Sequence, residues 1–338
     1  MGFNKKQNLE VGAEWIAAQN TDVLALQELK GFNQERLEQA ARKWGHQYSV
    51  IFDRQGGFPQ GLTAKTPIQK IEQIQPENNP KLRGTLHCKI AGVHFFVVHF
   101  DPRNYHNRRK EASAVAGRVK PLVEAGEQVV VLGDCNAHSI ADQKFLSKQT
   151  ALIKHWRDKE KENKSFRAFV EGGEIDFSVL QTLFDAGLVD PAIDAVGTFP
   201  TRLLDSDITD DELNSLMQRI DFILVSSHFP KCVVSYPRDS ILDKISDHYP
   251  VILKIQWKAK WLRPSPSCRL SNGSEVQNVV DATKDFLQKA GALEVSGVFS
   301  GGTLIYCSGQ GKRIWDDQLP PVVMYGPLGM AVGIGWQK

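Results

Sequence analysis

Short apolar runs of strand length recur along most of this 338-residue sequence, and no other feature restricts the fold as much. Residues 129–132, Val-Val-Val-Leu, are the most apolar of these runs, and helical patterns separate only some of them. A strict alternation of strands and helices would predict one parallel sheet covered on both faces. Because the alternation is not strict here, we predict an α+β fold in which a two-layer β-sandwich of mixed sheets is flanked by helices.

The individual elements follow from the spacing of the apolar residues. The predicted strands are residues 23–26, 48–52, 61–64, 82–89, 93–99, 129–132, 220–225, 233–236 and 251–257. The predicted helices are residues 8–19, 34–44, 105–125, 142–164 and 177–186. Residues 205–212 are strongly acidic, and they would repel a nucleic-acid backbone if they lined a cleft.

The composition changes at residues 258–267, where two prolines stand among lysine, arginine and serine. We interpret this segment as a linker between a large domain of residues 1–257 and a small C-terminal α+β segment, residues 268–338. Within the second part, residues 274–290 have an apolar stripe at helical spacing, and residues 308–311 are typical of a hairpin turn. The sequence predicts no function for this segment.

Composition and charge exclude few functions. The chain is 41% hydrophobic and 24% charged, and its net charge of +2 is too small to indicate nucleic-acid binding by itself. No apolar run has the length of a membrane span, and the polar residues 1–10 do not resemble a secretory signal. Five cysteines without CxxC spacing favour reduced thiols, so we expect a cytoplasmic protein. The oligomeric state stays open.

Acidic, amide and histidine side chains gather at the ends of the predicted strands. Four segments share this property: Gln27-Glu28, Gly133-Asp134-Cys135-Asn136, Arg219-Ile220-Asp221 and Ser246-Asp247-His248. Carboxylates suit Mg²⁺ or Mn²⁺, and an aspartate beside a histidine can fix its tautomer for proton transfer or phosphate binding. Each segment alone has a simpler explanation, such as a turn or a strand entry. Together they supply what metal-assisted hydrolysis of a phosphate ester requires.

In their order along the chain, these segments resemble the endonuclease/exonuclease/phosphatase (DNase-I-like) superfamily. The matching stretches are Leu24-Ala25-Leu26-Gln27-Glu28, Val97-Val98-His99-Phe100, Val131-Leu132-Gly133-Asp134-Cys135-Asn136, Arg219-Ile220-Asp221-Phe222-Ile223 and Ser246-Asp247-His248-Tyr249-Pro250-Val251. The resemblance covers about residues 1–257 and implies a hydrolase that depends on Mg²⁺ or Mn²⁺. It does not extend to the C-terminal segment.

The resemblance also implies a role for each site residue. Glu28 and Asp247 would bind the metal, and His99 would hold a phosphate oxygen. Asp134 would orient or deprotonate the attacking water, or serve as the acid for the leaving group, while Asn136 would contact the nucleophile or the phosphate. Asp221 would orient His248, which would contact the phosphate or transfer a proton.

The helix after His99 carries Arg108 and Arg109, which we predict to bind the substrate along its phosphate backbone. The alternative interpretation is a solvated first helical turn. Asp142 either braces the loop that contains Asn136 or has no role in the site.

The sequence departs from the family pattern at its start. The family begins with a strand whose asparagine contacts the metal, whereas this sequence opens at Met1-Gly2-Phe3-Asn4, in what resembles the turn after that strand. We therefore expect the first strand and one metal ligand to be missing. Nuclease activity is our first choice among phosphodiesterase activities, with phospholipid and inositol phosphates as alternative substrates. A non-catalytic binding or scaffold protein that keeps the fold is the competing hypothesis.

Overall fold

The structure is a computed structural model that describes residues 6–255, except 53–57, 80–81, 164–166, 193 and 195, together with residues 296–300 and 303–307. The chain divides into two compact units, Met1–Gln256 and Trp257–Lys338. The predicted linker 258–267, the predicted helix 274–290 and the predicted turn 308–311 lie outside the described residues. Of the second unit, only a hairpin is described, in which β14 (Ser296–Ser300) pairs antiparallel with β15 (Thr303–Cys307).

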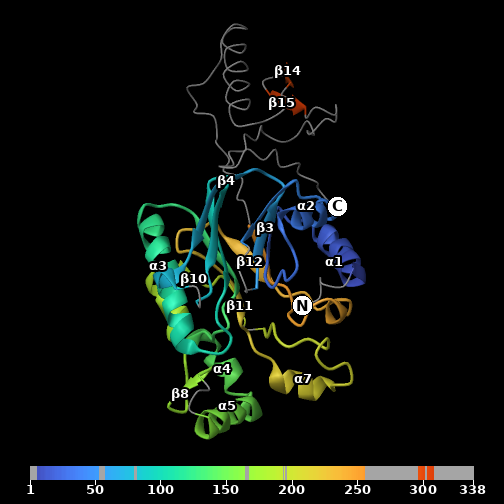
Figure 1. The fold of residues 1–338 in the computed structure, drawn as a ribbon. Helices are drawn as coiled ribbons and strands as arrows, with labels where there is room; N and C mark the ends of the chain where they lie inside the picture. Colours follow the sequence, from blue (N-terminus) through green and yellow to red (C-terminus); the bar gives the residue numbers. More distant parts are fainter. Residues whose placement is uncertain are drawn as a thin grey trace. The chain divides into compact units, whose positions relative to one another are not determined.

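Two sheets form the first unit (Figure 1). The smaller has the order β1-β3-β2 and is antiparallel, with β1 (Val23–Leu26), β2 (Tyr48–Phe52) and β3 (Gln60–Ala64). The larger has the order β10-β11-β7-β6-β5-β4, with β4 (Ile68–Ile74), β5 (Thr85–Ile90), β6 (Val93–His99), β7 (Val129–Asp134), β10 (Leu188–Val189) and β11 (Asp221–Ser226). Only β6 and β7 pair in parallel within it, so the sheet is mixed as predicted. Short pairs are also formed by β8 (Val170–Glu171) with β9 (Glu174–Ile175) and by β12 (Cys232–Ser235) with β13 (Ile252–Ile255).

Helices flank these sheets (Figure 1). The α-helices are α1 (Lys6–Gln19), α2 (Gln34–Lys43), α3 (Tyr105–Glu124), α4 (Gln143–Leu146), α5 (Thr150–Glu162), α6 (Ser178–Asp185) and α7 (Asp210–Leu216). The short 3-10 helices are η2 (Pro76–Asn78), η3 (Ile140–Asp142) and η4 (Leu242–Lys244). The starts of α2 and α3 are fixed by Asn33 and Asn104, whose side chains accept hydrogen bonds from the backbone of the first turn. None of the helices among the described residues has the length and apolar character needed to cross a membrane.

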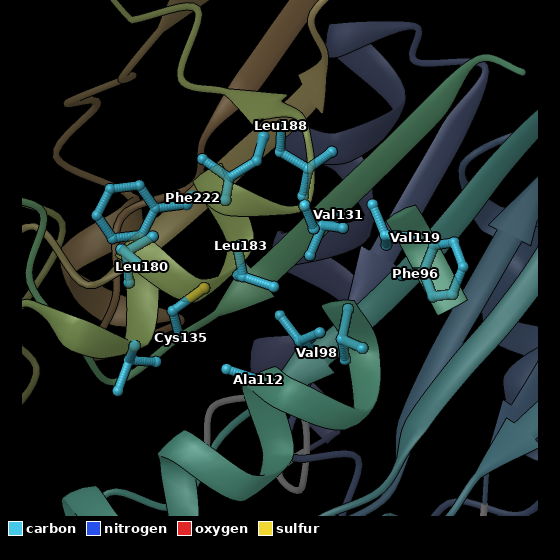
Figure 2. Close-up of a cluster of buried hydrophobic side chains, with 14 of the residues drawn as sticks. Phe96, Val98, Ala112, Val119, Val131, Cys135, Leu180, Leu183, Leu188 and Phe222 are labelled. Atoms are coloured by element: carbon cyan, nitrogen blue, oxygen red, sulfur yellow. The ribbon is translucent and has the colours of Figure 1, made fainter. Parts of the chain in front are cut away.

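The alternation of side chains along each strand separates two buried layers. Val97 of β6 faces the smaller sheet and packs in one cluster with Leu62 of β3 and Leu86 of β5. Its neighbours Phe96 and Val98 face the other way, toward α3 and α6, as Figure 2 shows. The larger sheet is therefore buried on both faces, which makes it a rigid support for residues at its edge.

Some elements differ from the prediction for identifiable reasons. The apolar residues of β4 are spaced by three, at Ile68, Ile71 and Ile74, so they do not alternate and the strand was not predicted. Its pairing with β5 also shifts in register between Ile68 and Lys70. The acidic stretch 205–212 runs into α7, which begins with a capping box formed by Thr209 and Glu212. The predicted helix 142–164 is divided into η3, α4 and α5.

Gly133 lies in β7 with a φ of 131°, and a Cβ atom there would overlap the backbone oxygen of Val98 in β6. We expect Gly133→Ala to lower the free energy of unfolding by about 3 kcal/mol, since neither backbone can move without breaking the sheet. Urea unfolding measures the loss. Gly126→Ala is the matched control, because Gly126 also has a positive φ but faces open space. Equal losses in the two variants would contradict the proposed overlap.

Candidate active site

The pairing of three neighbouring strands places His99, Asp134 and Asp221 side by side. His99 of β6 is the register partner of Asp134 of β7, and Asp134 is the register partner of Asp221 of β11. The side chain of Asp134 is buried between the other two, with 6% of its surface exposed. We call these three residues the catalytic row. The sequence predicted each of them from a separate strand end.

His248 lies next to this row and completes it. Its Nδ1 is 2.8 Å from Oδ2 of Asp221, and side-chain atoms of Asp134, Asp221 and His248 lie within 4.8 Å of one another. Burial disfavours the charged imidazole, but the charges of Asp221, Asp134 and Asp247 outweigh it and raise the pKa of His248 to about 10. The imidazole is therefore a cation at neutral pH, held by Asp221.

Asp134 is held by Asn136. The backbone N–H of Asn136 donates to Oδ1 and its Nδ2 donates to Oδ2 of Asp134, each at 2.8 Å. Burial, with the charge of Asp221 second, raises the pKa of Asp134 to about 7. Asn136 and Glu28 both have a left-handed backbone, with φ of 45° and 57°. Such conformations are uncommon for residues other than glycine and cluster at functional sites.

His99 accepts a hydrogen bond from a residue that the sequence did not indicate. Nη1 of Arg83 lies 2.5 Å from Nε2 of His99, and burial together with the charge of Arg83 lowers the pKa of His99 well below its usual value. The same nitrogen lies 3.8 Å from Glu28 and 3.5 Å from Asp134. Because the imidazole is neutral, neither contact is an ion pair. Arg83 stands just before β5, and a lone arginine before a strand gives no signal in the sequence.

The backbone around Arg83 is fixed by Glu111, a fully buried residue of α3. One carboxyl oxygen of Glu111 accepts the backbone N–H of Arg83 at 2.6 Å, and the other accepts that of Asp101 at 2.8 Å. Glu111 thus joins the segments that precede β5 and follow β6. Burial nevertheless dominates and raises the pKa of Glu111 to about 7.

This shift predicts a stability change with pH. Between pH 4.5 and pH 7 the unfolded chain has lost the Glu111 proton while the folded chain keeps it, so stability falls as the pH rises. Relative to Glu111→Gln, the wild-type free energy of unfolding should fall by about 3 kcal/mol across this window. Urea unfolding at a series of pH values measures it. Glu124→Gln, at an exposed site on α3, is the control. If the difference in free energy of unfolding between wild type and Glu111→Gln did not vary with pH, the expectation would be contradicted.

The structure does not bring all predicted residues to the row. Asp247 is buried beside His248, and its backbone oxygen accepts the N–H of Thr201, but its carboxylate is not part of the cluster described above. The two arginines predicted to bind the substrate, Arg108 and Arg109, both make contacts within the fold. Arg108 is buried, donates to the backbone oxygen of Asp101 and lies over the ring of Phe169.

Arg109 forms ion pairs with Glu171 and Asp176, at 2.6 Å and 2.9 Å. Arg108 is buried, so its guanidinium is not available for a phosphate backbone and it does not lie in a solvated turn. The side chain of Arg109 is partly exposed, and its role in substrate binding stays a prediction. The sequence could not separate these cases, because the partner residues Phe169, Glu171 and Asp176 follow far along the chain.

Arg219 connects the loop after β7 to β11. It donates two hydrogen bonds to Asp142, at 2.7 Å and 2.8 Å, and a third contact of 2.6 Å joins it to Asp190. Arg219 and Asp142 are both buried. Asp142 thus braces the loop that contains Asn136, one of the two alternatives left by the sequence.

The carboxylates fit a divalent cation. Asp134 and Asp221 are register partners on adjacent strands, Glu28 is close to His99, and the repulsion between Asp134 and Asp221 contributes to the raised pKa of Asp134. A hard cation would relieve this repulsion, and carboxylate oxygens are the ligands that Mg²⁺ and Mn²⁺ prefer. His248 is excluded as a ligand while it is protonated, because both of its nitrogens then carry hydrogen.

Comparisons with known proteins indicate the family and the fold of this chain. The sequence profile of the endonuclease/exonuclease/phosphatase family matches residues 13–248. No curated protein sequence matches the chain. An AP endonuclease from Archaeoglobus fulgidus is similar in structure, with a TM-score of 0.54 and 17% identity over 74% of this chain and 94% of that one.

Two Neisseria structures are also similar. A 3′ phosphatase, NExo, bound to a product DNA hairpin has a TM-score of 0.51 and 19% identity, over 73% of this chain and 93% of that one. A 3′-5′ exonuclease, NExo, from Neisseria meningitidis has a TM-score of 0.50 and 19% identity, over 73% and 96%. At these identities the similarity establishes a shared DNase-I-like fold.

Proposed function

This chain belongs to the endonuclease/exonuclease/phosphatase family, and we propose that it uses a divalent metal ion to hydrolyse phosphodiester bonds in nucleic acid. The observation that carries the proposal is the catalytic row, with cationic His248 at its end. Members of this family are phosphoesterases, and the residues of the row together with His248 supply a proton acceptor, a cationic donor and carboxylates for a metal.

Glu28 and Asp247 are the proposed metal ligands. The position of Glu28 beside His99 supports its role, and the contribution of the Asp247 charge to the raised pKa of His248 supports the other. Mg²⁺ or Mn²⁺ bound here would neutralise phosphate charge and polarise the phosphorus–oxygen bonds. Calorimetric titration with Mg²⁺ distinguishes this proposal from a non-catalytic scaffold, which would bind no metal.

The protonation states suggest how the work is divided among the other residues. Asp134 has a pKa of about 7, which suits a group that takes a proton from the attacking water near neutral pH. Asn136 orients this carboxyl group through its two hydrogen bonds. Of the two roles that the sequence left open for His248, the charged imidazole favours a donor to a phosphate oxygen, oriented by Asp221.

His99 acts indirectly in this scheme. Its Nε2 accepts a hydrogen bond from Arg83, so it orients that guanidinium. Arg83 then supplies the positive charge and the donors for the phosphate oxygen that we had assigned to His99 itself. Glu111 accepts the backbone N–H of Arg83 and so holds Arg83 and His99 in position beside the row.

The two titrating groups predict a bell-shaped dependence of kcat/KM on pH. Activity should rise with pH up to about 7 as Asp134 loses its proton, with the midpoint lowered by bound metal, and should fall near pH 10 as His248 loses its own. Asp221→Asn removes the carboxylate that holds the charge on His248, so the alkaline limb should move to lower pH. Hydrolysis of bis-p-nitrophenyl phosphate between pH 5 and pH 11 measures both limbs. An alkaline limb that stays in place in the variant would contradict the role of Asp221.

The first test of the function is hydrolysis of bis-p-nitrophenyl phosphate with Mg²⁺, with Mn²⁺ and with a chelator. We expect turnover that requires metal and falls steeply in His248→Ala. DNA, RNA, phospholipid and inositol phosphate substrates then identify the class, and faster hydrolysis of a lipid or an inositol phosphate than of either nucleic acid would overturn the nuclease assignment. Absence of turnover together with absence of Mg²⁺ binding would favour the scaffold hypothesis.

A further inference from the structure

Phe58 is an exposed aromatic residue at the margin of the catalytic row, with 44% of its surface accessible to solvent. Its ring lies edge-on to the ring of His99, with 6.1 Å between the centroids. The position is fixed from the other side, because the backbone oxygen of Pro59 accepts the N–H of Leu29, the residue after Glu28. Burial of an exposed phenylalanine is favourable, so a ring held at this place is suited to a flat apolar group.

Arg83 joins this ring to the phosphate end of the site. Its guanidinium carbon lies 4.9 Å from the centroid of the Phe58 ring, and its Nη1 donates to His99. Within the described part of the chain this is the one hydrogen bond that the guanidinium makes, so further donors remain for a ligand. An anionic oxygen bound by Arg83 and a planar group on Phe58 would therefore be neighbours.

The chemistry of the pair distinguishes between classes of phosphate ester. A quaternary ammonium head group binds aromatic rings, but the Arg83 cation already lies over Phe58 and would repel it. An inositol phosphate has no flat apolar face to place against Phe58, and the main charges that act on Arg83 are carboxylates, those of Asp134, Glu111, Asp101 and Glu28. A nucleoside phosphate combines one anionic group with one stacking group, which matches both partners.

We propose that Phe58 and Arg83 form a subsite that binds the nucleoside next to the scissile phosphate, with the base or sugar against Phe58 and the phosphate oxygen on Arg83. This inference rests on the proposed function and names the part of the substrate that the site recognises. Phe58 is a specificity-determining residue in this scheme, and the reacting atoms lie with Arg83 and the catalytic row.

Two substrates with the same leaving group test the subsite. Thymidine 5′-(p-nitrophenyl) phosphate carries a nucleoside, and methyl p-nitrophenyl phosphate does not. We expect Phe58→Ala to lower the ratio of their kcat/KM values by about 10- to 100-fold, as the loss of one stacked base predicts. Phe58→Trp should keep the wild-type ratio. Tyr48→Ala is the matched control, because Tyr48 is also an exposed aromatic residue. It lies at the start of β2, whereas the end of β2 pairs with Gln60, close to Phe58 in the chain.

The outcomes separate the subsite from the proposed function. An active wild-type enzyme whose ratio is the same in Phe58→Ala as in Tyr48→Ala would overturn the subsite and leave the function standing. A wild-type protein that hydrolyses neither ester would overturn the function, and the subsite is then tested by binding alone. In that experiment a fluorescent oligothymidylate is titrated with protein in the presence of a chelator. Weaker binding by Phe58→Ala than by Tyr48→Ala supports the subsite, and equal binding overturns it.

Discussion

Replacing Asp134 by asparagine is expected to lower kcat for bis-p-nitrophenyl phosphate by about 10³-fold, within the range found when a proton-transferring group is removed. Asp134 is the central member of the catalytic row, and an amide in its place cannot accept a proton from water. The two carboxylate oxygens of Asp134 accept hydrogen bonds from Asn136, and in asparagine an NH₂ group would replace one of these acceptors. The substitution removes the proposed proton acceptor and its orientation while keeping the size of the side chain.

A matched control separates this effect from the loss of any buried carboxylate. Asp176 is also buried, but it pairs with Arg109. We expect Asp176→Asn to change kcat by no more than about threefold, since its partner lies outside the proposed proton-transfer chemistry. Initial rates at saturating substrate and metal measure both variants. If Asp134→Asn kept a tenth or more of the wild-type kcat, Asp134 would not be the proton acceptor.

Replacing Arg219 by methionine is expected to lower the free energy of unfolding by about 3–5 kcal/mol at pH 7, the usual cost of removing one partner of a buried ion pair. The variant leaves Asp142 and Asp190 without their cation, and Asp142 is buried. The loop after β7 would lose its link to β11, so kcat should fall as well.

The pH dependence of this loss identifies its cause. Burial raises the pKa of Asp142 even beside Arg219, and loss of this cation would raise it further, so the variant loses stability relative to wild type as the pH rises above about 4. The deficit relative to wild type should therefore be larger at pH 7 than at pH 4. Urea unfolding at both pH values measures it. Arg118→Met removes a largely exposed ion pair with Glu72 and should cost less than about 1 kcal/mol. A deficit that is equal at both pH values would mean that lost packing, not unpaired charge, causes it.

The success of the sequence-based predictions depended on how far apart the interacting residues lie. The strands β1, β2 and β6 were predicted with their observed bounds, because their apolar residues are contiguous. β4 was missed because its apolar residues are spaced by three and do not alternate as those of a half-buried strand do. The C-terminal prediction of a helix, a linker and a turn stays a prediction.

The same distinction applies to the site. Asp134, Asn136, Asp221 and His248 each stand within a short, ordered motif, and the structure brings them together. Their catalytic roles remain proposals.

Arg83 and Glu111 were not predicted as site residues, because their roles depend on contacts of α3 with the ends of β5 and β6. For Arg108 and Arg109, the sequence indicated positive charge near His99 but not the buried or acidic partners that engage it. Residue type and order predict which chemistry is present, whereas burial and pairing across the fold decide which residues are available to perform it.

The parallel pairing of β6 with β7, and the later addition of β11, also bear on how the protein becomes active during its synthesis. A ribosome releases the chain from its N-terminus, so His99 and Asp134 emerge long before Asp221 and His248. The half of the site on β6 and β7 can form with α3 as the connection between these two strands. It lacks the cationic His248 and the carboxylate of Asp221 that holds this imidazole. By the proposed mechanism, a nascent chain would therefore have no hydrolytic activity until β11 has paired with β7.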